Sequence, residues 1–173
     1  METLRCIKER RSIRSFKPEP ISDKVIEEIL TAAINAPSSG NVQDWEFIIV
    51  KEKENKKKIA EAALGQNFIS EAPVIIVVCS NLKRISYAYG QRGKYLYSIQ
   101  NTAAAIENIL LSAWDKGLGS CWVGAFNEIE IKKILNLPNE VKPLAIIPIG
   151  YPKQIPQKPK RRDLKEVVHY EKY

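Results

Sequence analysis

The chain has 173 residues, of which 45% are hydrophobic and 27% are charged, and its formal net charge is +7. This composition is ordinary for a globular protein and excludes a mainly disordered or collagen-like chain. A chain of this length predicts a single domain over residues 1–173, with a core large enough to need no disulfide or metal ion.

The first half of the chain predicts helices that alternate with short strands. Apolar residues at helical spacing indicate helices over residues 4–9, 25–34 and 55–64, with Ser22 as the N-cap of the second. Residues 37–41 carry proline, serine, glycine and asparagine, which is typical of a loop. Strands are expected over residues 47–50 and 73–79, the second being fully buried.

The second half is dominated by one long helix over residues 95–116, which is apolar around much of its circumference and is therefore expected to be buried on several sides. Residues 80–94 are polar with several tyrosines, so we expect a loop or lid there. Strands over 121–123 and 144–149, a helix from Asn127 to Leu135, and a surface-crossing tail complete the chain. The alternation of strands and helices, taken alone, favours a parallel α/β sheet.

Neither a membrane span nor a zinc site is expected. The longest apolar run has only the length of a strand, and the first residues lack the apolar core of a secretory signal, so we expect a cytoplasmic protein. The chain has three widely separated cysteines and one histidine, which is unlike a zinc site. We interpret Cys79 and Cys121 as small buried hydrophobes.

Positive charge is concentrated at the two ends of the chain, because residues 1–18 and residues 151–173 each carry a net charge of +4. Such ends can be solvated tails, a nucleic-acid-binding surface, or two halves of a site for one compact anion such as phosphate. Few aromatic residues interleave with the basic ones, which disfavours nucleic acid.

Three segments stand out as candidate binding motifs. In an extended stretch, Arg10, Ser12 and Arg14 would project to one face, an arrangement suited to a phosphate or an electron-rich ring edge. Residues 37–45 gather short hydrogen-bonding groups, a glycine and an aromatic, and residues 159–162 form a second basic cluster. Each segment alone could be a surface turn or tail. Because the chain offers no evident nucleophile or carboxylate pair, an enzyme of this sequence would use a cofactor.

Taken together and in this order, these segments resemble the nitroreductase family of FMN-dependent oxidoreductases. The resemblance covers residues 4–168 and consists of an RxS motif, a PSSxNxQ-type loop after the second helix, a glycine-ended strand before Phe126, and a late lysine/arginine pair. It implies an α+β sandwich with a mostly antiparallel sheet flanked by helices, in place of the parallel sheet. It also implies an intertwined homodimer with two FMN sites at its interface, across which the long helix would pack against its mate.

The resemblance also implies which residues bind the cofactor. Basic residues from both ends would hold the FMN phosphate and ribityl chain. Arg14 would lie near the pyrimidine edge, where a cation stabilises the negative charge of the reduced ring. No catalytic side chain and no metal ligand are expected. The expected cofactor-binding residues are Arg10, Arg11, Ser12, Arg14, Pro37, Ser38, Ser39, Asn41, Asn67, Val123, Gly124, Lys160 and Arg162.

Within this set, the residues of the 37–41 loop would reach the flavin of the partner subunit. Asn67 would lie at the polar edge of the ring, and Val123 and Gly124 would present backbone N–H groups near flavin N5 and O4. The chain departs from many members of the family at Asp44, which stands where they carry proline before the tryptophan. Tyr87, Tyr89 and Phe126 are further candidates for stacking or gating residues.

The implied activity is transfer of hydride from NADH or NADPH through FMN to an oxidised small-molecule acceptor, such as a nitroaromatic or quinone, by a ping-pong scheme. The expected partner is a second copy of the chain, with no nucleic acid or membrane partner. One alternative is specialised flavin chemistry in the same fold, such as flavin fragmentation or reductive dehalogenation. Another is a flavin- or nucleic-acid-binding module without turnover.

Overall fold

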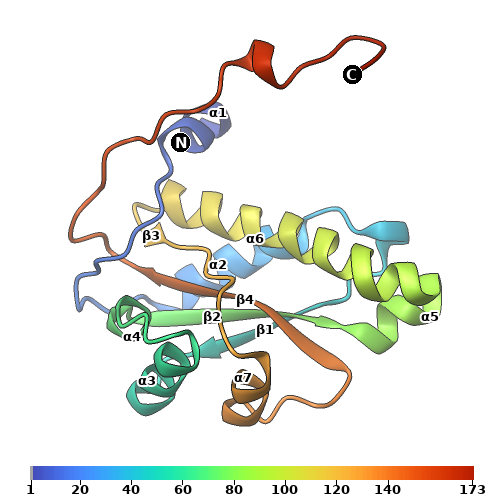
Figure 1. Cartoon of the computed structure of the whole chain (residues 1–173). Helices are drawn as coiled ribbons and strands as arrows, with labels where there is room; N and C mark the ends of the chain where they lie inside the picture. The colour runs from blue at the N-terminus through green and yellow to red at the C-terminus, as the bar shows by residue number, and fades with distance from the viewer. Residues whose placement is uncertain (1) are drawn as a thin grey trace.

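The computed structural model of the protein describes residues 2–173 and contains a four-stranded sheet (Figure 1). The strands are β1 (Trp45–Val50), β2 (Val74–Asn81), β3 (Gly119–Ser120) and β4 (Val141–Gly150), in the order β1-β2-β4-β3. Every neighbouring pair is antiparallel. The α+β class that the resemblance implied is thus confirmed, and the parallel sheet expected from element spacing is wrong, because an intervening helix does not by itself fix the direction in which the chain returns.

The strand β2 lies at the centre of the sheet, and its alternating side chains enter two different cores. Ile76 and Val78 pack with α2 (Asp23–Ile34) and α6 (Ser98–Asp115) on one face. The intervening residues Ile75, Val77 and Cys79 face the opposite core. That core is covered by α3 (Lys53–Ala62), α4 (Phe68–Glu71) and α7 (Glu128–Ile134), as Figure 1 shows. The continuous apolar run over residues 74–79 follows from burial of both faces.

Helix boundaries expected from capping residues agree with the structure. The helix α1 (Thr3–Glu9) occupies the first predicted helical segment. Ser22 caps α2, since its hydroxyl accepts a hydrogen bond from Val25 N at 3.4 Å. Asn127 caps α7 by accepting from Ile129 N and Glu130 N at 3.0 and 3.2 Å. These side chains satisfy backbone N–H groups that have no partner within the helix.

The loop or lid expected over residues 80–94 is wrong, because most of this stretch forms α5 (Leu82–Arg92). The side chain of Asn81 accepts from Arg84 N at 3.0 Å and so begins the helix. Only Ile85 of α5 is buried, so the helix needs little apolar sequence. A π-helical turn, Gly93–Tyr97, then leads directly into α6.

The strand expected over residues 121–123 is also misplaced. The observed strand β3 lies just before it, and Val123 makes only an isolated bridge with Ile146 of β4. Gly119 accounts for this position. A Cβ atom there would lie 2.5 Å from Ile13 Cγ1, so only glycine lets β3 approach the N-terminal segment.

After β4 the chain continues as an exposed tail that contains only the short 3-10 turn Leu164–Glu166. The beginning of this tail is paired with the segment that follows α1. Lys17 N donates to Tyr151 O at 2.8 Å, and Lys153 N donates to Ser15 O at 2.9 Å. Figure 1 shows the tail passing near α1, so the two ends of the chain lie on the same side of the molecule. Within residues 2–173, none of the helices combines the length and the hydrophobicity that a membrane span requires.

Candidate functional site

The two basic ends of the chain meet at one pocket of about 320 Å³, called here the arginine pocket. A smaller pocket of about 260 Å³ adjoins it, since Ser12, Arg14 and Pro156 belong to both. The pairing of the tail with residues 15–17 brings the ends together. The lining residues of the arginine pocket are Arg10, Arg11, Ser12, Arg14, Pro156, Gln157, Pro159 and Arg161.

The N-terminal wall of the pocket is an extended segment anchored by Ile13. The Ile13 side chain is fully buried, and its backbone N donates to Ser120 O at 2.9 Å. Because successive side chains of an extended segment point to opposite sides, burial of Ile13 directs Ser12 and Arg14 to the other side. The position of these residues therefore depends on the contact between Ile13 and β3.

Arg11 is held rigidly at the end of α1. Its Nη1 donates to the carbonyl oxygens of Lys8, Glu9 and Arg10 at 3.1, 2.6 and 2.8 Å. A cation is favourable there because the last carbonyls of a helix carry partial negative charge. The Nε atom of Arg11 is buried and has no hydrogen-bond partner within residues 2–173. A buried donor without an acceptor is costly.

Arg10 and Arg14 bring further positive charge to the pocket. Arg10 forms a long ion pair with Glu107, in which its Nε lies 3.8 Å from Glu107 Oε1. The guanidinium of Arg14 lies 5.9 Å from the centre of the Phe68 ring, in a cation–π contact. Asn67 directly precedes Phe68 in the sequence and is exposed, so this contact places it in the neighbourhood of Arg14. The four arginines that line the pocket outnumber the carboxylate of Glu107 beside Arg10, so the pocket is positive.

Cys121 lies close to Arg10, Ser12 and Arg14 in the N-terminal wall of the arginine pocket. The sequence did not predict this position. Burial raises the pKa of its thiol, while the charges of Arg14 and Arg10 and a hydrogen bond with Ser12 act to lower that pKa, and the net direction is upward. The thiol therefore remains protonated near neutral pH and adds no negative charge to the arginine pocket.

The C-terminal contribution differs from the one expected, because Lys160 and Arg162 do not line the arginine pocket. Arg162 instead pairs with Glu166, with Nε 3.2 Å from Oε2 and Nη2 donating to the Glu166 carbonyl at 2.9 Å. Arg161, which lies between the two predicted residues, lines the pocket, and its Nη1 donates to Pro159 O at 3.1 Å. The basic cluster was recognised in the sequence, but its pattern did not show which cation faces the pocket.

The expected backbone donors near the glycine-ended segment are also altered. The N–H of Val123 donates to Ile146 O at 3.0 Å, so this amide is not free for a cofactor as the resemblance implied. Gly124 is the next residue, is exposed, and has no side chain to block a ligand. It is the amide of this pair that a cofactor could reach.

The predicted loop residues Pro37, Ser38, Ser39 and Asn41 lie apart from the arginine pocket within one copy of the chain. The loop contains the 3-10 turn η1 (Ser39–Asn41) and packs at the first turns of α6, where Ser39 N donates to Asn101 Oδ1 at 2.9 Å. The structure thus brings together the N-terminal and C-terminal basic segments, but not the loop that the resemblance joins to them.

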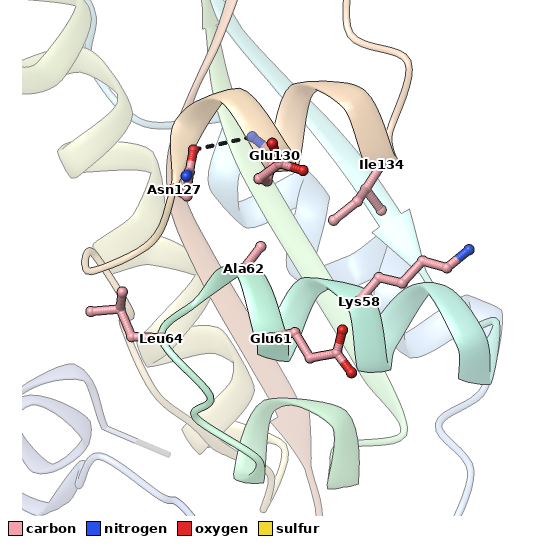
Figure 2. A pocket seen from close by; sticks show the side chains of 7 residues that line it. All are labelled: Lys58, Glu61, Ala62, Leu64, Asn127, Glu130 and Ile134. Carbon is pink, nitrogen blue, oxygen red and sulfur yellow. Dashed lines mark hydrogen bonds between the residues drawn. The ribbon is translucent and has the colours of Figure 1, made fainter.

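A larger open groove of about 440 Å³ lies between α3 and α7 (Figure 2). Its polar side chains have mixed charge, since Lys58 and Glu61 come from α3 and Glu130 comes from α7. Asn127, also at this groove, is occupied in capping α7. None of the residues predicted to bind a cofactor lines this groove, so the arginine pocket is the candidate site.

A model described as the nitroreductase family matches residues 7–72 and 64–151. A relative from Archaeoglobus fulgidus, provisionally named NADH dehydrogenase/NAD(P)H nitroreductase, is 39% identical over 88% of this chain and 86% of its own. The Bacillus subtilis protein named FMN reductase [NAD(P)H] is 34% identical over 99% of this chain and 74% of its own.

Solved structures show the same similarity. The NADPH:FMN oxidoreductase from Vibrio harveyi, complexed with NAD+, matches with a TM-score of 0.91 and 26% identity. The match covers 99% of this chain and 77% of that one. The fold built from the four-stranded sheet is therefore shared along nearly the whole chain.

Proposed function

Because the chain belongs to the nitroreductase family, we propose that it binds FMN and uses NADH or NADPH to reduce an oxidised acceptor, such as a nitroaromatic or a quinone. Relatives named FMN reductase and NADPH nitroreductase support the general oxidoreductase reaction. The observation in this chain that carries the proposal is the arginine pocket, in which the two ends of the polypeptide converge.

The residues of the arginine pocket fit a phosphate ester. Guanidinium groups present forked donors that match phosphate oxygens, and Ser12 adds a hydroxyl. The buried Nε of Arg11 lacks an acceptor within residues 2–173, and a phosphate oxygen would provide one. Held by three backbone carbonyls, this guanidinium would lose little freedom when an anion binds.

The chain's own residues would bind and orient the cofactor rather than transfer protons. Arg10, Arg11, Ser12 and Arg161 would hold the phosphate, while Arg14 would place a cation near the ring system. Gly124 would offer a backbone amide, and Asn67 a polar side chain. When bound, FMN would supply the redox chemistry, accepting hydride from the nicotinamide nucleotide and delivering it to the acceptor in a ping-pong order.

A second copy of the chain would complete the site. In one copy, the loop with Pro37, Ser38, Ser39 and Asn41 contacts α6 and is absent from the lining of the arginine pocket. We therefore assign these loop residues to the cofactor held by the partner copy. Ile99 of α6 is 51% exposed and Ile34 of α2 is 51% exposed, and burial of such apolar residues would favour association.

The direct test is a visible absorption spectrum followed by anaerobic titration. The purified protein should be yellow or should take up added FMN, should bleach on addition of NADH or NADPH, and should recover its colour when a nitroaromatic or quinone is added. A colourless protein that does not take up FMN would overturn the proposal. Bleaching without recovery by any simple acceptor would favour specialised flavin chemistry instead.

The dimeric arrangement is tested by complementation. An Arg11→Ala protein and an Asn41→Ala protein should each bind FMN weakly. Mixed and refolded together, they should regain tight binding in a fraction of the sites, because a mixed dimer has one site with neither substitution. If the mixture binds FMN no better than the separate variants, each site is built from one copy alone.

A further inference from the structure

The loop over residues 38–43 has an unusually strained backbone. Gly40, Asn41 and Gln43 have φ values of 53°, 56° and 52°, all in the left-handed region. Glycine adopts this region freely, but it costs roughly 1 kcal/mol for each residue that has a Cβ atom. Such a conformation persists only where neighbouring residues hold it.

Asp44, at the end of the loop, is fully buried, with 0% of its surface exposed. Its carboxylate accepts a hydrogen bond from the Ser80 hydroxyl of β2. It accepts another from Asn101 Nδ2 of α6, at 2.6 Å. Its backbone carbonyl accepts from Asn81 N at 2.7 Å. Asp44 thereby joins the start of β1 to the central strand and to the long helix.

Asn101 passes this connection on to the loop. Its side chain is buried, and its Oδ1 accepts from Ser39 N at 2.9 Å and from Ser39 Oγ at 3.1 Å. The Asn101 amide must point its Nδ2 at Asp44 and its Oδ1 at Ser39, because carboxylates only accept and backbone N–H groups only donate. The carboxylate of Asp44 therefore fixes the amide in the orientation that Ser39 requires.

Other contacts hold the outer side of the loop. Gln43 N donates to Ser38 Oγ at 3.1 Å, and Arg84 of α5 donates to Gln43 O at 3.0 Å. The hydroxyl of Tyr89 lies so close to Gly40 that a Cβ atom there would collide with it. The residues that hold the loop in this shape thus all belong to the same copy of the chain.

We infer that Asp44 is a positioning residue, which acts through Asn101 and Ser39 to hold the 38–43 loop in the shape that receives the flavin of a partner copy. The inference rests on the proposed function, since it concerns the loop that we assign to FMN. A loop that is already ordered does not pay the entropy of ordering when the ligand binds. At this place the resemblance leads one to expect proline, which has no side-chain acceptor and could not make this connection.

The test compares FMN dissociation constants, from quenching of flavin fluorescence, with urea unfolding of the same variants. Asp44→Ala and Asn101→Ala should each weaken FMN binding about tenfold, the loss expected from a hydrogen bond with a charged group. Asp44→Asn is the conservative variant. Its amide oxygen can still accept from Asn101 and its NH2 can donate to Ser80, so its FMN affinity should equal that of wild type.

Two further variants separate positioning from general loss of stability. Glu52→Ala removes the cap of α3, where Glu52 accepts from Glu54 N and Asn55 N on the opposite face of the sheet. It should lower stability and leave FMN affinity unchanged. Ser80→Ala, whose side chain bonds to Asp44 and not to the loop, should fold and should weaken FMN binding by about threefold.

The outcomes distinguish the inference from the function on which it rests. If wild-type protein does not bind FMN, the proposed function fails. If wild type binds FMN and the folded Asn101→Ala or Ser80→Ala variants bind it equally well, the positioning role is refuted while the function stands. Loss of FMN binding in Glu52→Ala that matches the loss in Asn101→Ala would also refute it, since the effect would then follow stability alone.

Discussion

At the scale of single residues, the site depends on which of three adjacent cations faces the arginine pocket. Arg161 lines the pocket, whereas Arg162 is paired with Glu166 in the exposed tail. We predict that Arg161→Ala weakens FMN binding about tenfold, the loss expected for a charge-assisted hydrogen bond. Arg162→Ala should change the affinity by less than about twofold, because Arg162 does not line the pocket. Its exposed ion pair with Glu166 contributes little to stability. Fluorescence titration of both variants checks this, and the reverse order would contradict the structure.

The sequence indicated that Arg10, Ser12 and Arg14 share one face, but it did not indicate that Arg161 faces the pocket. The difference is that only the N-terminal segment contains a buried apolar residue. The N-terminal segment contains an apolar residue, Ile13, whose burial fixes the alternation of its neighbours. The tail around Arg161 is exposed throughout, so no buried residue in it specifies which side chains face the pocket. The Asp44–Asn101 bond was not predicted either, since these residues are 57 positions apart in the sequence.

Cys79 gives a residue-scale prediction about pH. Burial raises the pKa of its thiol from an ordinary value of 9.0 to about 12. Between these values the unfolded chain loses a proton that the folded chain keeps, so a rising pH favours unfolding by about 1.4 kcal/mol per pH unit. Urea unfolding at pH 8 and pH 10 should show a smaller loss of stability for Cys79→Ala than for wild type. Equal losses would mean that the folded thiol titrates normally.

At the scale of elements, the contact between β3 and the N-terminal segment couples the fold to the site. A Cβ atom at Gly119 would lie 2.5 to 2.9 Å from three side-chain carbons of Ile13. We predict that Gly119→Ala costs about 1–3 kcal/mol, as overpacking of a core does. It should also weaken FMN binding, because Ser12 and Arg14 flank the displaced residue. The measurements are urea unfolding and FMN titration.

The control for this variant is Asn127→Ala, which removes the N-cap of α7 and should cost about 1 kcal/mol. Its FMN affinity should remain that of wild type, because Asn127 lies at the groove between α3 and α7 rather than at the arginine pocket (Figure 2). If both variants bind FMN as wild type does, Gly119 matters only for stability.

The elements themselves were predicted where capping or continuous burial marks them, as for α2, α7 and β2. The prediction failed where an element draws little on the core. The helix α5 buries only Ile85, so its sequence lacks an apolar stripe and looks like a loop. The strand β3 has two residues, which is too short for any alternation to appear. The direction of the strands was not visible in element spacing and was implied only by the resemblance.

In the folded molecule, the two basic ends of the chain come together at one site. The pairing of Lys17 with Tyr151 and of Ser15 with Lys153 brings them together beside the sheet. The sequence shows the two concentrations of charge but not this long-range pairing, because backbone hydrogen bonds carry no residue signature. The convergence creates a positive pocket on a chain whose middle is nearly neutral.

A comparison of FMN with riboflavin shows whether basic residues from both ends of the chain bind the phosphate of FMN. Riboflavin has the same ring and ribityl chain but no phosphate. We predict that the protein binds FMN about 100-fold more tightly than riboflavin, since two charge-assisted hydrogen bonds to a phosphate contribute about 3 kcal/mol. Arg161→Ala should reduce that preference. Equal affinity for the two flavins would mean that these basic residues do not bind the phosphate.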